Sequence, residues 1–206
     1  MASRTQHNPA QENVRTSVLD AIGRLLERYG YRKMTVDDIA HEAGIGKGTV
    51  YLYFSSKEEA ALSWFDRIHD QLIQEMLSIA RSDAEPAQRI RSMLVGRVMF
   101  SFDHMQAFAL SLDELFAAVR LSLLDRRDRY HSEEAGALSL VLEDGCKSNA
   151  FEIEDIPSVA ESLVLAMNSL LPYSLSTAQL GEREQIETKA NRLASLILNG
   201  LLRRSS

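Results

Sequence analysis

Apolar residues recur at helical spacing from the first part of the chain. Between residues 14 and 29 six of them fall at steps of three and four, which predicts one amphipathic helix that Gly30 ends. These residues are Val14, Val18, Ala21, Ile22, Leu25 and Tyr29. Thr35, followed three residues later by Asp38, resembles a capping box that opens a second helix, expected from about Val36 to Ala43.

A third short helix is expected from Lys47 to Phe54, where Val50 and Phe54 are four residues apart. The intervening Gly44-Ile45-Gly46 supplies a tight turn. Two short helices joined by a glycine-containing turn form a helix-turn-helix.

The rest of the chain also has helical periodicity. A fourth helix is expected over Leu62 to Ile79, and a fifth from Pro86 to about Phe102. No Gly or Pro lies between Gly96 and Gly136, so the helix boundaries between residues 103 and 135 stay open. Later signals are a stop at Gly145, a connector over 145–157, a helix that starts at Pro157, and a final apolar stripe from Ile186 to Leu201. The pattern predicts an all-α protein of about nine helices.

Composition narrows the class of protein. The chain has 206 residues, 45% hydrophobic and 25% charged, which are globular values, and no apolar run reaches the roughly 18 residues of a membrane span. The single Cys146 excludes an intrachain disulfide and a cysteine-based zinc site. Residues 1–12 are polar and contain Pro9, so we expect a flexible arm, neither a signal peptide nor a membrane anchor, on a cytoplasmic protein.

Charge is unevenly distributed along the chain. The net charge is −6, but residues 1–57 hold eight Lys and Arg against six Asp and Glu, so this part is +2 and the remainder −8. The division predicts a helix-turn-helix domain over residues 13–57 and a larger helical domain over residues 58–206.

The outward face of the third helix carries the most informative chemistry. At 100° per residue, Val50 and Phe54 point inward while Gly48 and Leu52 point outward, with Thr49 and Tyr51 on the flanks. A glycine permits close approach to another surface, and Lys47, Thr49 and the tyrosines can bind phosphate oxygens. These are the means of binding DNA. The alternative is that the tyrosines only pack the three-helix unit and that Lys47 is solvated.

The run from Thr35 to Glu58 resembles the DNA-binding signature of TetR-family transcriptional regulators. It reads TVDDIAHEAGIGKGTVYLYFSSKE without a gap and follows Tyr29-Gly30-Tyr31. The detailed resemblance covers roughly residues 14–65, and the remainder is similar to the family only in helix count and length.

This resemblance implies a dimeric repressor or activator, not an enzyme, whose recognition helix enters the major groove of a palindromic operator in double-stranded DNA. The phosphate-contacting positions of the family correspond to Thr35, Thr49, Tyr53 and Lys57. The positions near base edges correspond to Lys47, Gly48, Tyr51 and Leu52. Leu52 departs from the polar or aromatic residue often found there, which indicates an apolar contact to a thymine methyl and leaves the operator sequence open.

The resemblance also implies a small effector bound by the larger domain. The fifth helix has more apolar surface than one core-facing stripe requires, so we expect a pocket for an apolar or aromatic molecule, oriented by a few polar groups. The candidate residues are Trp64, Phe65, Met93, Arg97, Phe100, Ser101, His104, Phe108 and Met167. The alternative is that Met and Phe at this spacing form plain core.

Two C-terminal stripes predict a homodimer. Small residues on the helix that starts at Pro157 permit close helix approach, and the final helix offers an apolar stripe, so together they supply half of an intermolecular four-helix bundle, as the resemblance implies. The expected interface residues are Ser162, Ala166, Ser169, Leu193, Ile197 and Leu201. The alternative is that both stripes close the core of one monomer.

A rival interpretation is a helical-bundle metalloenzyme. The chain has two Asp/His pairs at i, i+3, Asp66 with His69 and Asp128 with His131, and such spacing presents two ligands to one metal. However, the acids are Asp rather than Glu, and Asp128 lies in a strongly charged run over residues 125–129 that is typical of a solvated face. No cofactor or metal is therefore expected. No phosphate-binding glycine loop or nucleophile motif occurs either.

Overall fold

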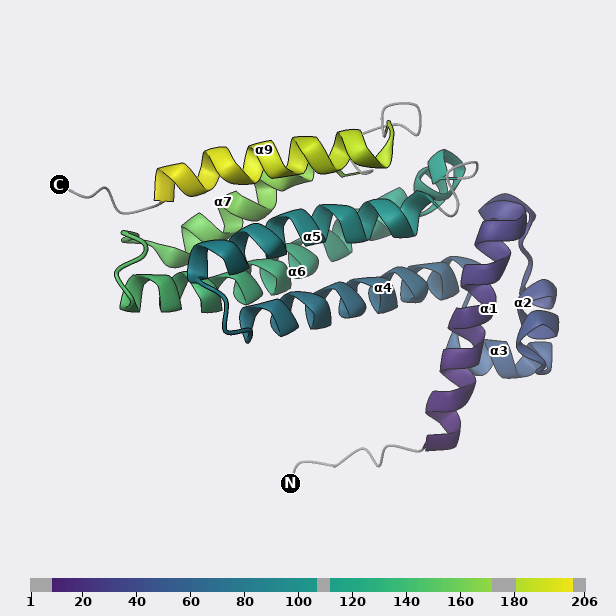
Figure 1. Cartoon of the computed structure of the whole chain (residues 1–206). Coiled ribbons are helices and arrows are strands. Elements are labelled where there is room, and N and C mark those ends of the chain that lie inside the picture. Colours follow the sequence, from purple (N-terminus) through teal and green to yellow (C-terminus); the bar gives the residue numbers. More distant parts are fainter. Residues whose placement is uncertain (1–8, 107–111, 172–180, 202–206) are drawn as a thin grey trace, which may run out of the picture. The chain divides into compact units, whose positions relative to one another are not determined.

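The computed structural model describes residues 9–106, 112–171 and 181–201, and its regular elements are all helices (Figure 1). The all-α prediction is confirmed. The helices are α1 (Pro9–Lys33), α2 (Val36–Ala43), α3 (Lys47–Tyr53), α4 (Lys57–Ala80), α5 (Pro86–Gln106), α6 (Leu112–Lys147), α7 (Ile156–Asn168) and α9 (Arg183–Leu201). None of these helices is long and apolar enough to span a membrane.

The chain forms two compact units. Unit 1 comprises Met1–Arg67 with Leu110–Arg120, and unit 2 comprises Ile68–Ala109 with Leu121–Ser206. The compact unit that holds the helix-turn-helix therefore continues ten residues past the expected domain end at Lys57 and includes the first turns of α6. Both α4 and α6 contribute residues to each unit.

Helix α1 differs from the expected helix at both ends. It begins at Pro9, so the last four residues of the expected arm are helical. Gly30 interrupts the regular helix with φ 75°, a left-handed conformation that favours glycine, but one further turn continues to Lys33. Tyr29 was expected on the apolar stripe and is half exposed instead, because the stripe leaves the core just before this kink. Val18, Ala21, Ile22 and Leu25 are buried as predicted.

The start of α2 confirms the predicted capping box. The Thr35 Oγ1 accepts a hydrogen bond from the Asp38 amide at 3.2 Å, and the Thr35 amide donates to Asp38 Oδ2 at 2.9 Å. The hydrogen bonds from Thr35 lower the pKa of the Asp38 carboxyl. Gly44, at φ 70°, ends α2 and begins the turn into α3.

Most of α6, the longest of the described helices, lies in unit 2. The sequence left the helix boundaries between residues 103 and 135 open, and in the structure α6 is continuous from Leu112 to Lys147. The sequence predicts a helix end at Gly145, but α6 continues two residues further, to Lys147. The chain then turns back, and the Gly145 carbonyl accepts hydrogen bonds from the amides of Ala150 and Phe151. The Phe151 ring lies against Gly145, where a side chain on that residue would collide with it. In this unit α9 packs beside α5 and α7 (Figure 1).

Candidate functional site

Helix α3 presents two faces of opposite character. Val50 is 1% exposed and Phe54, just after the helix, is 2% exposed, so both lie in the core of unit 1 as the helical wheel predicts. On the outer face, Leu52 is 82% exposed and Tyr51 is 49% exposed. Large apolar and aromatic side chains that protrude into solvent from a short helix indicate contact with another molecule.

Gly48 lies at the centre of this outer face. It is exposed, and a Cβ placed on it would meet no other atom within 4 Å. Neither internal packing nor a positive φ therefore requires a glycine at this position. Gly48 is the second residue of α3, and without a side chain its backbone is open to close approach by an external surface.

Lys47 is the first residue of α3, and its positive charge is paired with a nearby carboxylate. Its Nζ lies 2.7 Å from Asp37 Oδ2 of α2, and both side chains are at least half exposed. This contact raises the pKa of the Lys47 ammonium. An exposed pair of this kind contributes little to stability, so a phosphate oxygen can compete with Asp37 for the ammonium.

Lys57 is held more firmly than the sequence suggested. Its Nζ donates to the carbonyl oxygen of Tyr31 at 3.1 Å and lies 4.3 Å from the centre of the Tyr31 ring. Burial lowers the pKa of Lys57, and burial raises the pKa of the Tyr31 hydroxyl. The ammonium therefore joins α4 to the segment after Gly30, in addition to any contact with phosphate.

The remaining predicted DNA contacts lie near this helix. Thr35 is exposed, but its hydroxyl is already engaged in the capping box and also donates to Asp38 Oδ2 at 2.6 Å. Thr49 and Tyr53 are partly exposed on the flanks of α3, and the Tyr53 ring packs against Phe54. All eight predicted residues belong to unit 1.

Comparison with known proteins identifies a family that matches this part of the chain. The family model described as bacterial regulatory proteins, tetR family, matches residues 18–61, which include the whole helix-turn-helix of α2 and α3. The chain belongs to the TetR family. It is a DNA-binding transcriptional regulator with an N-terminal helix-turn-helix unit and a larger helical part.

Relatives of this TetR-family regulator extend the similarity beyond the helix-turn-helix. The transcriptional regulator YhgD of Bacillus subtilis is 28% identical over 139 residues, which cover 66% of this chain and 70% of YhgD. A TetR transcription regulator from Haloarcula marismortui has a similar fold, with a TM-score of 0.72 at 20% identity over 93% of this chain and all of that chain. FadR from Bacillus subtilis, solved with stearoyl-CoA, has a TM-score of 0.64 at 19% identity over 90% of this chain and 98% of FadR.

Two residues expected at the effector site of this regulator lie in the core of unit 1. Trp64 and Phe65 are buried on α4, with their rings 5.2 Å apart. Phe65 also stacks on Phe116 at 6.1 Å. The indole of Trp64 lies directly over Gly23, where a Cβ would stand 2.9 Å from its Nε1. Packing within unit 1 accounts for both aromatic residues.

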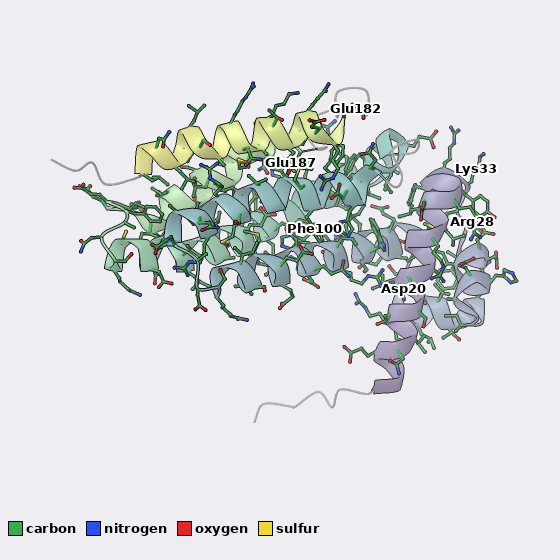
Figure 2. The ribbon with its side chains drawn as sticks, in the orientation of Figure 1. Asp20, Arg28, Lys33, Phe100, Glu182 and Glu187 are labelled. Atoms are coloured by element: carbon green, nitrogen blue, oxygen red, sulfur yellow. The ribbon has the colours of Figure 1, made fainter. Side chains whose placement is uncertain are left out.

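The other described candidates lie in unit 2, while Phe108 falls outside the described residues. Met93 and Met167 are fully buried. Phe100, labelled in Figure 2, lies on α5 and is partly exposed. Its ring stacks on His104 at 4.0 Å, and Ser101 is also partly exposed. His104 Nδ1 bonds the Phe100 carbonyl at 2.8 Å, which fixes the ring.

Arg97 is the centre of a buried polar cluster in unit 2. Its side chain is 1% exposed and forms an ion pair with Glu134, with Nη2 2.6 Å and Nε 2.7 Å from Oε2. Nη2 also donates to Asn168 Oδ1 at 2.7 Å, and the Asn168 amide contacts His131 Nε2 at 3.0 Å. A second histidine, His69, lies 2.9 Å from Glu133 and 3.8 Å from Glu134.

The rival metal-site interpretation is not supported by this arrangement. His69 of α4 contacts the carboxylates of Glu133 and Glu134 on α6, and His131 of α6 contacts the amide of Asn168 on α7. Across residues 9–106, 112–171 and 181–201, no three His, Cys, Asp or Glu side chains gather closely enough to hold a metal ion.

The expected dimer residues lie on the outer sides of α7 and α9. Ser162 and Ser169 are exposed, and Ala166 is partly exposed. On α9, Leu193, Ile197 and Leu201 are partly exposed. They flank the stripe that packs into the monomer, which consists of Ile186, Ala190, Ala194 and Leu198.

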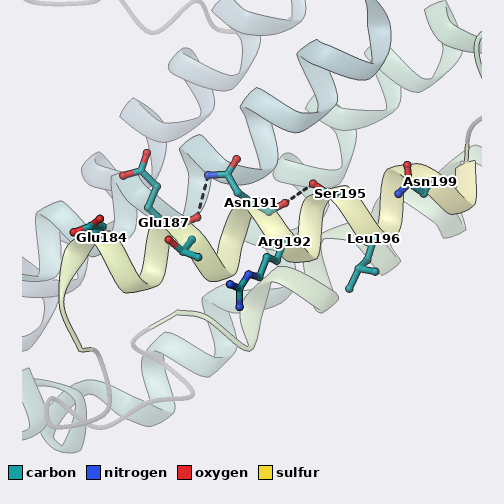
Figure 3. Close-up of a pocket in the computed structure, with 8 residues that line it drawn as sticks. Glu184, Glu187, Asn191, Arg192, Ser195, Leu196 and Asn199 are labelled. Atoms are coloured by element: carbon teal, nitrogen blue, oxygen red, sulfur yellow. Dashed lines mark hydrogen bonds between the residues drawn. The ribbon is translucent and has the colours of Figure 1, made fainter.

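A pocket follows one face of α9 (Figure 3). It is open, has a volume of about 670 Å³, and is lined by Glu184, Glu187, Thr188, Asn191, Arg192, Ser195, Leu196 and Asn199. No residue expected to bind the effector lines it. Hydrogen bonds from Asn191 and Ser195 to carbonyls one turn earlier keep these polar side chains close to the helix.

Two exposed leucines on α7 and α9, close to the expected dimer residues in sequence, were not predicted. Leu165 of α7 is 60% exposed and Leu196 of α9 is 71% exposed. Both were available from helical spacing, because Leu165 lies three residues after Ser162 and Leu196 three residues after Leu193. The sequence reasoning also missed Glu134, although a lone arginine in the apolar stretch over residues 93–102 signals a buried partner.

Proposed function

We propose that this regulator is a repressor that binds a palindromic operator with α3 in the major groove. The observation that carries the proposal is Gly48, whose bare backbone lies in open space between exposed side chains on the outer face of α3. Two such helices, related by the two-fold axis of a dimer, meet successive major grooves about one helical turn apart. We further propose that the protein acts in the cytoplasm and is not an enzyme, because its relatives are named as transcriptional regulators.

We propose separate roles for the residues of this face. Lys47, Gly48, Tyr51 and Leu52 lie near base edges, and the apolar Leu52 contacts a thymine methyl. Phosphates are contacted by Thr35, Thr49, Tyr53 and Lys57. The Thr35 hydroxyl and the Lys57 ammonium already make contacts that stabilise the fold. Their phosphate contacts therefore depend on the capping box and on the contact with Tyr31, respectively.

We propose homodimerisation through the outer faces of α7 and α9. Exposed Leu165 and Leu196 on these faces support the proposal, because large apolar side chains that are widely exposed in one chain are covered when two copies associate. Ser162, Ala166 and Ser169 allow the helices to approach closely. An interface of this type buries more than about 1,200 Å² in total.

We propose that a small apolar or aromatic effector releases the operator. The effector is bound by residues of unit 2, among them Met93, Arg97, Phe100, His104 and Met167. FadR, a protein of similar fold, was solved with stearoyl-CoA, an acyl ligand. Helix α4 contributes residues to both units, so a shift of α4 on effector binding reaches Lys57 and the recognition unit. Coupling of this kind is typically about 1–3 kcal/mol.

Selection of bound duplexes from a random DNA pool tests the proposed function. The proposal predicts enrichment of a palindrome whose half-sites are about one helical turn, or a multiple of it, apart. A pool that shows no enrichment over several rounds, with folded dimeric protein, would refute sequence-specific binding. The same experiment yields the operator for the measurements below.

A further inference from the structure

The Arg97 guanidinium has hydrogen-bonding capacity that the described structure does not use. Its Nε and Nη2 donate to Glu134 and Asn168, whereas Nη1 is buried and has no hydrogen-bond partner among the described residues. A guanidinium presents five N–H donors, two of them on Nη1. Leaving a buried charged donor unsatisfied is costly, so Nη1 is a candidate donor to a bound molecule.

Arg97 differs from the other arginines with an unsatisfied nitrogen. In Arg67 and Arg89 the unpaired atom is Nε, with one N–H, and their Nη1 atoms bond Asp20 and Ala80 respectively. Their side chains are also less buried, at 23% and 10% exposed against 1% for Arg97. Only at Arg97, among these three, does the forked end of the guanidinium carry the free donors.

The charges around Arg97 determine to what kind of group Nη1 can donate. The ion pair with Glu134 is already neutral overall. Asn168 Oδ1 accepts from Arg97, so the Asn168 amide nitrogen is the donor to His131 Nε2, and the proton of the neutral His131 is on Nδ1. An anionic ligand group would add a net buried charge, which costs more than one hydrogen bond returns. An uncharged oxygen acceptor adds none.

Two large apolar side chains lie near Arg97 on its own helix. Met93, one turn earlier, is fully buried, and Phe100, nearly one turn later, shares the same face of α5 and is partly exposed. Met167, the neighbour of Asn168 on α7, is also fully buried. We infer that Arg97 Nη1 binds an uncharged oxygen, the carbonyl or hydroxyl of an otherwise apolar effector. This inference rests on the proposed effector function and specifies the ligand class.

The test uses four probes with the same carbon chain: decane, decan-2-one, decanoate and decylammonium. Binding to the full-length protein is measured by titration calorimetry without DNA. Decan-2-one is expected to bind about tenfold or more tightly than decane, since a hydrogen bond to a charged donor contributes at least that factor. Decanoate and decylammonium are expected to bind more weakly than decan-2-one. Equal binding of decane and decan-2-one, tighter binding of decanoate, or no binding of any probe would overturn the inference.

A double variant and an infrared signal test whether Arg97 makes the contact with the ligand oxygen. Arg97→Met with Glu134→Leu removes donor and partner together and keeps the buried volume, so the chain stays folded, as a thermal melt verifies. The variant is expected to bind decan-2-one no better than decane. In infrared spectra of decan-2-one labelled with ¹³C at its carbonyl, the stretch is expected at lower frequency in the wild-type complex but not in the variant. An unshifted wild-type band would contradict the inference. Failure of operator binding would refute the proposed function alone, because these measurements use no DNA.

Discussion

The ammonium of Lys57 bonds the carbonyl of Tyr31 at 3.1 Å and lies 4.3 Å from the centre of its ring. This contact joins the start of α4 to the chain just after the kink at Gly30. A lysine at a position expected to bind phosphate is thus also part of the packing of unit 1. Its loss therefore has two effects, which different measurements separate.

Lys57→Ala is expected to lower the free energy of unfolding by about 1–2 kcal/mol, from the lost hydrogen bond and cation–π contact. It is also expected to weaken binding to all DNA sequences and to reduce the salt dependence by about one counterion per subunit. Urea denaturation measures the first effect and a salt titration of DNA binding the second. Lys147→Ala, which removes the same charge from unit 2, serves as the control. Unchanged values for both quantities would contradict the role of Lys57.

The buried ion pair in unit 2 gives a prediction about stability. Arg97→Met leaves Glu134 buried without its partner and is expected to cost about 3–5 kcal/mol. Arg97→Met with Glu134→Leu is expected to return to within about 1.5 kcal/mol of the wild type, because it removes both charges and keeps the volume. Chemical denaturation of the three proteins measures the difference. A double variant no more stable than the single one would show that the pair is not coupled.

Stability is also expected to depend on the protonation of His131. Burial lowers its pKa below the ordinary value of 6.5, so the unfolded chain binds a proton at a higher pH than the folded chain does. The contribution of His131 is therefore full above about pH 6.5 and is lost as the pH falls towards the folded pKa, with a slope of at most about 1.4 kcal/mol per pH unit. Protonation also removes the acceptor that Nε2 offers to Asn168.

Denaturation of wild type and His131→Gln between pH 7.5 and 5 checks this dependence. The glutamine oxygen still accepts from Asn168 but does not titrate, so the variant is expected to have a flatter profile than the wild type. His41→Gln, at an exposed position in unit 1, serves as the control for the loss of a histidine. Parallel profiles for wild type and His131→Gln would contradict the prediction.

The proposed dimer predicts different outcomes for two leucines of α9. Leu196→Asp is expected to give folded monomers, because Leu196 is widely exposed within one chain. Leu198→Asp is expected to unfold the chain, because Leu198 is buried in the monomer. Sedimentation and circular dichroism distinguish these results. Leu121→Asp, at a similarly exposed leucine of α6, is expected to remain dimeric. A wild-type protein that sediments as a monomer at micromolar concentration would exclude the dimer.

The sequence predicted unit 1 well because its signals are local. Thr35 and Asp38 are three residues apart, and Val50 and Phe54 are four apart, so their contacts follow from helical geometry alone. The same reasoning placed Gly48 on the outside of α3.

Unit 2 was less predictable because its decisive contacts are distant in sequence. Arg97 meets Glu134 across 37 positions and Asn168 across 71. No periodicity encodes such a pairing, although an arginine in an apolar stretch indicates that one exists. The end of α5 and the start of α6 were also not predictable, because the chain has no Gly or Pro between Gly96 and Gly136.

Binding of the selected operator by Gly48→Leu and Gly136→Leu tests the central claim most directly. Both glycines are exposed, helical and without an atom within 4 Å of an added Cβ, but only Gly48 lies on the proposed DNA-binding face. Both variants are expected to fold as dimers. Gly48→Leu is expected to lose about a thousandfold or more in operator affinity, down to non-specific binding, while Gly136→Leu binds like the wild type. Wild-type affinity in folded Gly48→Leu dimers at physiological salt would contradict the assignment of this face to DNA.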